Sequence, residues 1–216
     1  SLTVGGDVTW LHGDDLSASV DDIAAGRATT IRENILFGSA YGQGELTWAP
    51  ITARSLSVPE RGLELVCLAE PGATCRAVTD RQLEAAIAAD PQIVSLICGA
   101  NDVIGSVRPR VEVVASSLDG LWFALRSALP AASLLTCTYP AHGPRNLGPR
   151  SRERIAAGLR ELNAAIRLLA GRHRIACADL EGHPGVGDAA NFAADGLHPS
   201  ALGQLLMAGT IAPLIQ

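Results

Sequence analysis

The segment WLHGDDLSAS, residues 10–19, joins an apolar run to a glycine and then to acidic and small residues. Gly13, Asp14 and Asp15 form a polar turn between the end of a predicted strand and the start of a predicted helix. A tight turn of this kind can expose a nucleophilic side chain at the edge of a sheet. Asp15 occupies the position where a serine nucleophile would be expected, so the segment suggests chemistry by a carboxylate.

Three further segments carry polar residues directly after apolar runs. AEPGAT contains Gly72, CGAND contains Asn101, and DGLHPSALG contains Asp195 and His198 at the entrance to the last predicted helix. Taken singly, such a glycine makes a turn, an Asn-Asp pair caps a helix, and a D-x-x-H pair is a cap or a surface pair as often as a site. Their order and spacing together are more specific.

The elements that must position these residues alternate between strand and helix. Short apolar runs predict buried strands at residues 8–11, 63–68, 93–98, 133–138 and 175–180, because they are too short for helices and do not alternate. Amphipathic patterns predict helices at residues 48–56, 80–89, 110–129, 150–169 and 200–214. Thr79 is the predicted N-cap of the second of these helices.

This alternation predicts one domain over residues 1–216, a three-layer α/β/α fold with a five-stranded parallel sheet. Ligands of such sheets bind beyond the carboxyl ends of the strands, which is where the polar segments fall. Residues 21–44 are longer than a simple connection and are predicted to be a partly helical lid. Residues 141–152 are predicted to be a loop over the sheet edge.

In the order and content of these segments the chain resembles the SGNH hydrolase family, also called GDSL esterases and lipases. The family's first block, G-D-S followed by a small-residue turn, corresponds to GDDLSAS, with Asp15 in place of the serine. Its later blocks correspond to Gly72, to GAND with Asn101, and to DGLH. The resemblance implies the strand order 2-1-3-4-5.

The resemblance also implies roles for the matched residues. His198 would be the general base and Asp195 would orient its imidazole, as in a catalytic triad. Gly72 and Asn101 would donate hydrogen bonds to the oxyanion. Asp14 is expected to belong to the same oxyanion and substrate-binding site. Asp15 would work with His198 and Asp195 in place of the serine.

Several functions are open to an aspartate at the nucleophile position. Asp15 could attack an epoxide-like or ester substrate, or it could act as a general acid–base group in hydrolysis. Two alternatives are a non-hydrolytic cyclase or lyase that uses Asp15 and His198 for proton transfer, and a catalytically inactive binding protein. Ser17 or Ser19 would replace Asp15 only if the turn were shifted in register.

The composition limits the classes of partner that the protein is expected to bind. The net charge of −5 argues against nucleic acid, and no apolar stretch approaches the ~20 residues of a membrane span. The five cysteines lack metal-ligand spacing and predict buried free thiols, so no metal or cofactor is expected. A small-molecule substrate is the predicted partner. Without a visible signal peptide the expected location is cytoplasmic, and a secreted form with its signal removed would look the same.

Residues after the fourth predicted strand allow two interpretations. Tyr139, Pro140 and His142 could line a substrate pocket or simply form the loop. The arginines at positions 145, 150, 152 and 154 could clamp an anionic group, although a solvated loop and helix start is the simpler interpretation. The oligomeric state is not indicated by the sequence.

Overall fold

The computed structural model describes residues 31–38, 48–49, 52 and 63–215 of the 216-residue chain. Its core is a five-stranded parallel sheet in the order β2-β1-β3-β4-β5. The strands are β1 (Ile31–Gly38), β2 (Leu63–Cys67), β3 (Ile93–Ile97), β4 (Ser133–Cys137) and β5 (Ala176–Ala178). The predicted fold class and the strand order are therefore confirmed.

The first described strand is not the one that the sequence predicts. β1 covers Ile31–Gly38, inside the segment that is predicted as a partly helical lid, so that prediction is wrong for these residues. β1 lies between β2 and β3 and pairs with both. Residues 8–11, the predicted first strand, lie outside the described residues, as do the other residues of the predicted lid.

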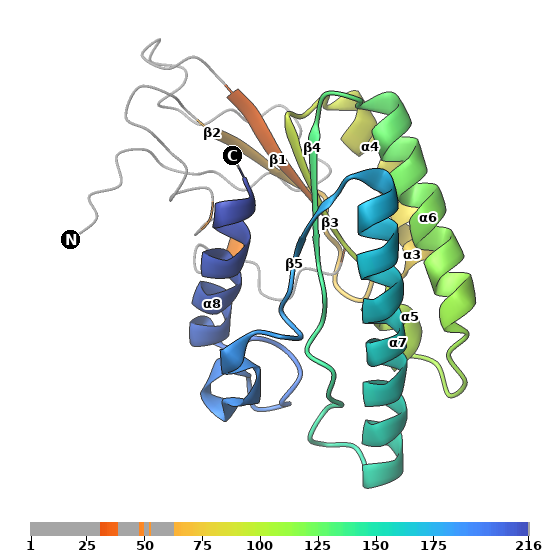
Figure 1. The fold of residues 1–216 in the computed structure, drawn as a ribbon, viewed down its shortest axis with the longest axis vertical. Coiled ribbons are helices and arrows are strands. Elements are labelled where there is room, and N and C mark those ends of the chain that lie inside the picture. Colours follow the sequence, from red (N-terminus) through yellow and green to blue (C-terminus); the bar gives the residue numbers. More distant parts are fainter. Residues whose placement is uncertain (1–30, 39–47, 50–51, 53–62, 216) are drawn as a thin grey trace, which may run out of the picture.

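Helices cover both faces of the sheet, as Figure 1 shows. α3 (Cys75–Arg81), α4 (Leu83–Ala88), α5 (Ala100–Ile104), α6 (Val111–Ala128) and α7 (Pro149–His173) lie on one side, and α8 (Ala201–Ile211) lies on the other. Three short 3₁₀ turns complete the described elements, at Pro184–Gly187, Ala189–Asn191 and Ala212–Leu214. No described helix has both the length and the hydropathy that a membrane crossing requires.

The larger part of the core lies between the sheet and the long helices α6 and α7. It includes Leu118, Trp122, Leu159 and Leu162, each exposed by no more than 1 %. A smaller cluster packs α8 against β4 and β5 through residues such as Ile211. The long helices therefore form a rigid support for the strands whose ends carry the polar segments.

The helix after Gly72 begins earlier than the sequence predicts. Thr74, not Thr79, is its N-cap, and the Thr74 Oγ1 accepts a hydrogen bond from the Ala77 amide at 3.3 Å. The hydroxyl of Thr79 instead donates to the Cys75 carbonyl one turn back, at 3.0 Å. α3 ends at Arg81 and α4 follows from Leu83, where a single helix is predicted.

Candidate active site

Asp195 and His198 lie side by side between β5 and α8. The Nδ1 of His198 lies 2.5 Å from the Oδ2 of Asp195, and the other carboxylate oxygen accepts the amides of Leu197 and His198 at 2.9 and 3.1 Å. About a third of each side chain is exposed, 32 % for His198 and 33 % for Asp195. Because Nδ1 faces the carboxylate, Nε2 is the ring nitrogen placed for proton transfer to a substrate.

The turn that carries this pair is fixed by its own backbone. Gly196 has a φ of +69°, which favours glycine, and its amide donates to the Ala193 carbonyl at 2.8 Å. The Ala193 amide donates to the His198 carbonyl at 2.7 Å. Ser200 then caps α8 by accepting the Gly203 amide. The sequence DGLHPS thus holds Asp195 and His198 in one orientation.

The carboxylate of Asp195 is held in its ionised form. Burial alone would raise its pKa, but the hydrogen bonds from the Leu197 amide and from His198 act in the opposite direction. The net result is a pKa for Asp195 below its ordinary value. An ionised Asp195 fixes the tautomer of His198 and stabilises the imidazolium that forms when His198 takes a proton.

Gly72 and Asn101 come together at the carboxyl ends of β2 and β3. The Asn101 Nδ2 donates to the carbonyl of Ala73, the residue after Gly72, at 2.9 Å. A carboxamide nitrogen carries two hydrogens, so one remains for a ligand. Gly72 has a φ of +76° and open space on the side where a Cβ would be. The side chain of Asn101 therefore lies against the loop that contains Gly72.

A buried contact from α7 supports the Asn101 loop. Asn163, fully buried, accepts the Tyr139 amide through Oδ1 at 2.8 Å and donates to the Tyr139 carbonyl through Nδ2 at 2.7 Å. The hydroxyl of Tyr139 in turn accepts the amide of Ala100, the first residue of α5. The backbone after β4 is thus joined to the loop that contains Asn101.

Asn163 is not among the site residues that the sequence predicts. The signal is that an asparagine interrupts the apolar stripe of α7, between Leu162 and Ile166. A buried amide must satisfy its donor and acceptor, so its presence on that face indicates a specific partner.

His142 contacts the turn that carries Asp195 and His198 from the side of β4. Its ring donates a hydrogen bond to the Gly196 carbonyl and packs edge-on against Phe192 with ring centroids 4.5 Å apart. Burial lowers the pKa of His142, and Arg145 and Arg152 lower it further, more than the hydrogen bond to Gly196 raises it. His142 is therefore a neutral positioning residue at pH 7.

Cys75 and Cys98 lie between the Gly72 and Asn101 segments. Their sulfur atoms are 3.8 Å apart and both side chains are buried, and all five cysteines are free. The hydrogen bond with Cys98 and burial both raise the pKa of Cys75 far above its ordinary value. A protonated, buried thiol is a poor nucleophile, so Cys75 serves packing.

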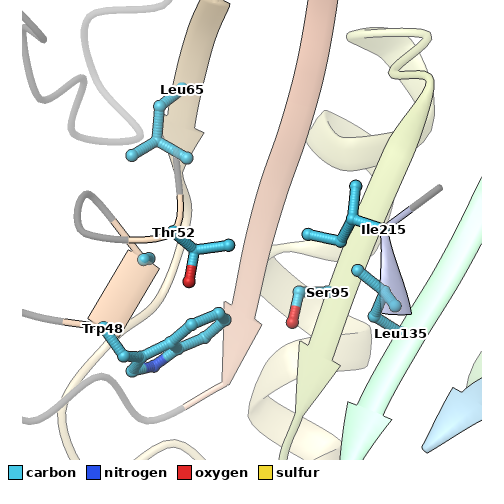
Figure 2. Close-up of a pocket in the computed structure, with 7 residues that line it drawn as sticks. Trp48, Thr52, Leu65, Ser95, Leu135 and Ile215 are labelled. Carbon is cyan, nitrogen blue, oxygen red and sulfur yellow. The ribbon is translucent and has the colours of Figure 1, made fainter. Parts of the chain in front are cut away.

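A small cavity lies along the α8 face of the sheet, away from the strand ends. It is lined by residues that include Trp48, Ser95, Leu135 and Ile215, which Figure 2 shows around the middle of β3. Its volume of about 10 Å³ corresponds to about one water molecule. This cavity is too small for an ester and is not the substrate site.

Four of the six predicted site residues fall in the described part of the chain, as two local pairs. Asp195 lies beside His198, and Gly72 beside Asn101; the segments that carry them lie at the end of the sheet shown lowest in Figure 1. Asp14 and Asp15 lie outside the described residues. Within the described ranges, no group of three or more His, Cys, Asp or Glu side chains is arranged to hold a metal ion.

A parallel α/β sheet with a histidine–aspartate pair at its carboxyl edge is an arrangement that hydrolases use. The model of the GDSL-like lipase/acylhydrolase family matches residues 21–206. The chain therefore belongs to this family, and the resemblance found in the sequence is confirmed.

Solved structures of the same fold agree with the family. A lipase/acylhydrolase from Enterococcus faecalis is 21 % identical, with a TM-score of 0.69 over 86 % of this chain and 95 % of that one. An acetyl xylan esterase is 18 % identical, with a TM-score of 0.68 over 85 % and 100 %. A phospholipase A1 from Streptomyces albidoflavus NA297 is 19 % identical, with a TM-score of 0.63 over 86 % and 98 %. At these identities the likeness concerns the fold. No curated protein matches the chain.

Proposed function

We propose that the protein hydrolyses carboxylic esters with His198 as general base, Asp195 as the group that orients it, and Gly72 and Asn101 as oxyanion donors. The observation that carries this proposal is the contact of His198 Nδ1 with an ionised Asp195, which makes Nε2 the ring nitrogen that would exchange a proton with the substrate. The contact of Asn101 with Ala73 supports the second half of the site. The domain boundaries, 1–216, and a small-molecule substrate are part of the same proposal.

The nucleophile is better assigned to the residue after β1 than to Asp15. In this sheet order the ligand crevice opens where β1 and β3 end, and Gly38, the last residue of β1, pairs with Ile97 of β3. The next residue in the sequence is Ser39. Asp15 precedes the family match, which begins at residue 21. We therefore propose Ser39, which lies outside the described residues, as the nucleophile.

The sequence around Ser39 supports this assignment only in part. It reads FGSAYG, with a glycine directly before the serine and an alanine directly after it. The family's first block has an aspartate between the glycine and the serine, and that aspartate is absent here. GDD at residues 13–15 retains the Gly-Asp pair but has no serine. Asp15 thus stays a second candidate, with the epoxide or ester chemistry that a carboxylate nucleophile allows.

With Ser39 as nucleophile, the steps follow from the positions of the described groups. The serine oxygen attacks the acyl carbon while its proton passes to His198 Nε2, and the carbonyl oxygen takes the negative charge. The Gly72 amide and the second Asn101 hydrogen would stabilise that charge. The imidazolium then gives its proton to the leaving alcohol. Water, activated by the same histidine, releases the acid and restores the serine.

Side-by-side variants test the assignment. We expect 4-nitrophenyl acetate hydrolysis by the native protein, and a loss of kcat on the order of 10³-fold or more in Ser39→Ala and His198→Ala, as for removal of a serine nucleophile or its base. A sulfonyl fluoride should add its mass to the peptide that contains Ser39. Asp15→Asn should keep native turnover.

The other outcomes separate the alternatives. Loss of activity in Asp15→Asn with native turnover in Ser39→Ala would identify Asp15 as the nucleophile. Styrene oxide, an epoxide, would then be the next substrate to test. If the native protein hydrolyses no ester and takes no label, the catalytic proposal fails and a binding function replaces it.

A further inference from the structure

The arginines of this acidic chain differ in how they are neutralised. In the described part of the chain, side chains away from the site are paired with carboxylates, as for Arg76, Arg81, Arg160, Arg167 and Arg172. Arg126 and Arg154 donate to backbone carbonyls instead.

The arginines without an ion pair among the described residues gather at one end. Arg108 and Arg110 lie in the connection before α6, and Arg145, Arg150 and Arg152 lie in the loop before α7 and in its first turn. Arg154, which donates to the Ser106 carbonyl, joins the two segments. Arg174, at the far end of α7, and Arg126, in the last turn of α6, are the exceptions. Uncompensated positive charge is thus concentrated where β3 and β4 end.

Arg145 is the member of this group nearest to the catalytic pair. Its amide donates to the Asp195 carbonyl at 2.7 Å. Its side chain crosses the backbone of Gly196, since a Cβ on Gly196 would meet the Arg145 Cγ, Cδ and Nε atoms. The residue is exposed. Arg145 is therefore fixed against the turn between Asp195 and His198, with its guanidinium accessible to a ligand.

Glu112 lies in the first turn of α6, two residues after Arg110, and two other carboxylates close to this group already have partners. Asp195 is engaged by His198, and Glu153 is paired with Arg160. The positive charge of Arg145 and Arg152 acts on the neighbouring His142, because both arginines lower its pKa. Guanidinium groups bind carboxylate and phosphate oxygens through paired, charge-assisted hydrogen bonds.

We propose that Arg145 forms an anion subsite beside His198, and that the substrates are esters which carry a carboxylate or phosphate group. This inference rests on the proposed ester hydrolysis and specifies its substrate class. Arg152 adds to the field, and Arg145 makes the contact.

Two matched pairs of esters test the subsite on either side of the scissile bond. For the acyl side, 4-nitrophenyl valerate is compared with the mono-4-nitrophenyl ester of glutaric acid, which has the same five-carbon acyl chain with a terminal carboxylate. For the alcohol side, methyl 4-acetoxybenzoate is compared with 4-acetoxybenzoate. The enzymes are the native protein, Arg145→Gln, Arg145→Lys and Arg174→Gln.

For at least one pair, Arg145→Gln should lower kcat/KM for the charged ester about tenfold, the effect of losing one charge-assisted hydrogen bond. Its kcat/KM for the neutral partner should stay near the native value. Arg145→Lys should restore part of the loss. Arg174→Gln removes an unpaired arginine at the other end of α7 and should match the native protein. The pair that responds identifies the side on which the anion lies.

Two results would overturn the subsite. Equal losses for charged and neutral esters in Arg145→Gln would mean that Arg145 only supports the catalytic turn. Unchanged kcat/KM for both pairs would mean that it binds no anion. Absence of turnover by the native protein on all four esters is a different result, because it removes the proposed hydrolysis itself.

Discussion

At the scale of single residues, Asp195 has three acceptor contacts, with the Leu197 amide, the His198 amide and the His198 ring. Asp195→Asn can keep the two amide contacts through its carbonyl oxygen. It loses the negative charge that stabilises an imidazolium, and it can hold the ring in the wrong tautomer. We expect kcat for 4-nitrophenyl acetate to fall by about 10²-fold or more, with little change in KM.

Asp188→Asn is the matched control for this change. Asp188 is an exposed aspartate in the same connection, and it caps the Ala190 amide at 2.9 Å. Asparagine caps equally well, so this variant should keep native kcat. Native turnover by Asp195→Asn would show that His198 does not depend on Asp195 for proton transfer.

At the scale of elements, the contact between α7 and the end of β4 supports the loop that carries Asn101, a proposed oxyanion donor. Tyr139→Phe removes the acceptor of the Ala100 amide, and an unsatisfied buried amide costs about 1–3 kcal/mol. We expect a fall of that size in the free energy of unfolding. Because Ala100 precedes Asn101, we also expect a lower kcat at temperatures where the variant is fully folded, with KM nearly unchanged.

Asn163→Leu tests the same support from α7. It would leave the Tyr139 amide and carbonyl without their partner. The free energy of unfolding, measured in urea, should fall by roughly 2 kcal/mol or more. Ser117→Ala on α6, where an exposed hydroxyl donates to the Val113 carbonyl, is the control and should be nearly neutral. If Tyr139→Phe loses stability while its kcat stays native, the contact serves packing and does not position Asn101.

The burial of His142 against the turn from Asp195 to His198 predicts a dependence of stability on pH. The pKa of His142 is lowered in the folded state, so the unfolded chain binds a proton more readily. The stabilisation is fully present above the ordinary histidine pKa of about 6.5. It decreases as the pH falls from there to the lowered pKa of the folded state.

Thermal unfolding of the native protein and of His142→Asn between pH 5 and 8 measures this dependence. The difference in Tm between the two should shrink as the pH falls. A constant difference over this range would show that His142 does not titrate differently in the folded and unfolded states.

Which elements the sequence predicts depends on what stabilises them. β3 and β4 follow from uninterrupted apolar runs, and α6 and α7 from long amphipathic patterns. β1 contains Arg32, Glu33 and Asn34 before its short apolar run, so local composition conceals it. Its pairing with β2 shifts register between Arg32 and Ile35, and regular pairing with β3 begins at Ile35. β1 is thus defined by its neighbours in the sheet, which pattern reasoning does not include.

The same distinction applies to the site. Asp195 and His198 are three residues apart and are held by a local turn, so their spacing alone indicates their contact. Gly72 and Asn101 come from the ends of two different strands. From the sequence, only the resemblance to a family predicts that they lie close together in space. The position of β1 matters most for the proposed nucleophile, because a first strand at residues 8–11 favours Asp15 whereas β1 at Ile31–Gly38 favours Ser39.

At the scale of the whole molecule, charge is arranged unevenly. The chain has a net charge of −5, yet the arginines without carboxylate partners in the described part lie mainly where β3 and β4 end. An anionic substrate would be repelled by the molecule as a whole and attracted by this end. Such an arrangement favours binding at the site over binding elsewhere on the surface.

Ionic strength separates these contributions. The Debye length falls from about 30 Å at 0.01 M salt to about 10 Å at 0.1 M, so attraction by arginines beyond Arg145 is screened over this range. We expect kcat/KM for the charged ester that responds to Arg145 to fall severalfold with added salt, while that of its neutral partner stays level. In Arg108→Gln/Arg110→Gln the salt dependence should be weaker, although Arg145 is intact. Equal salt dependence of the charged and neutral esters would confine the effect to Arg145 itself, and the gathered arginines would then have no part in attracting the substrate.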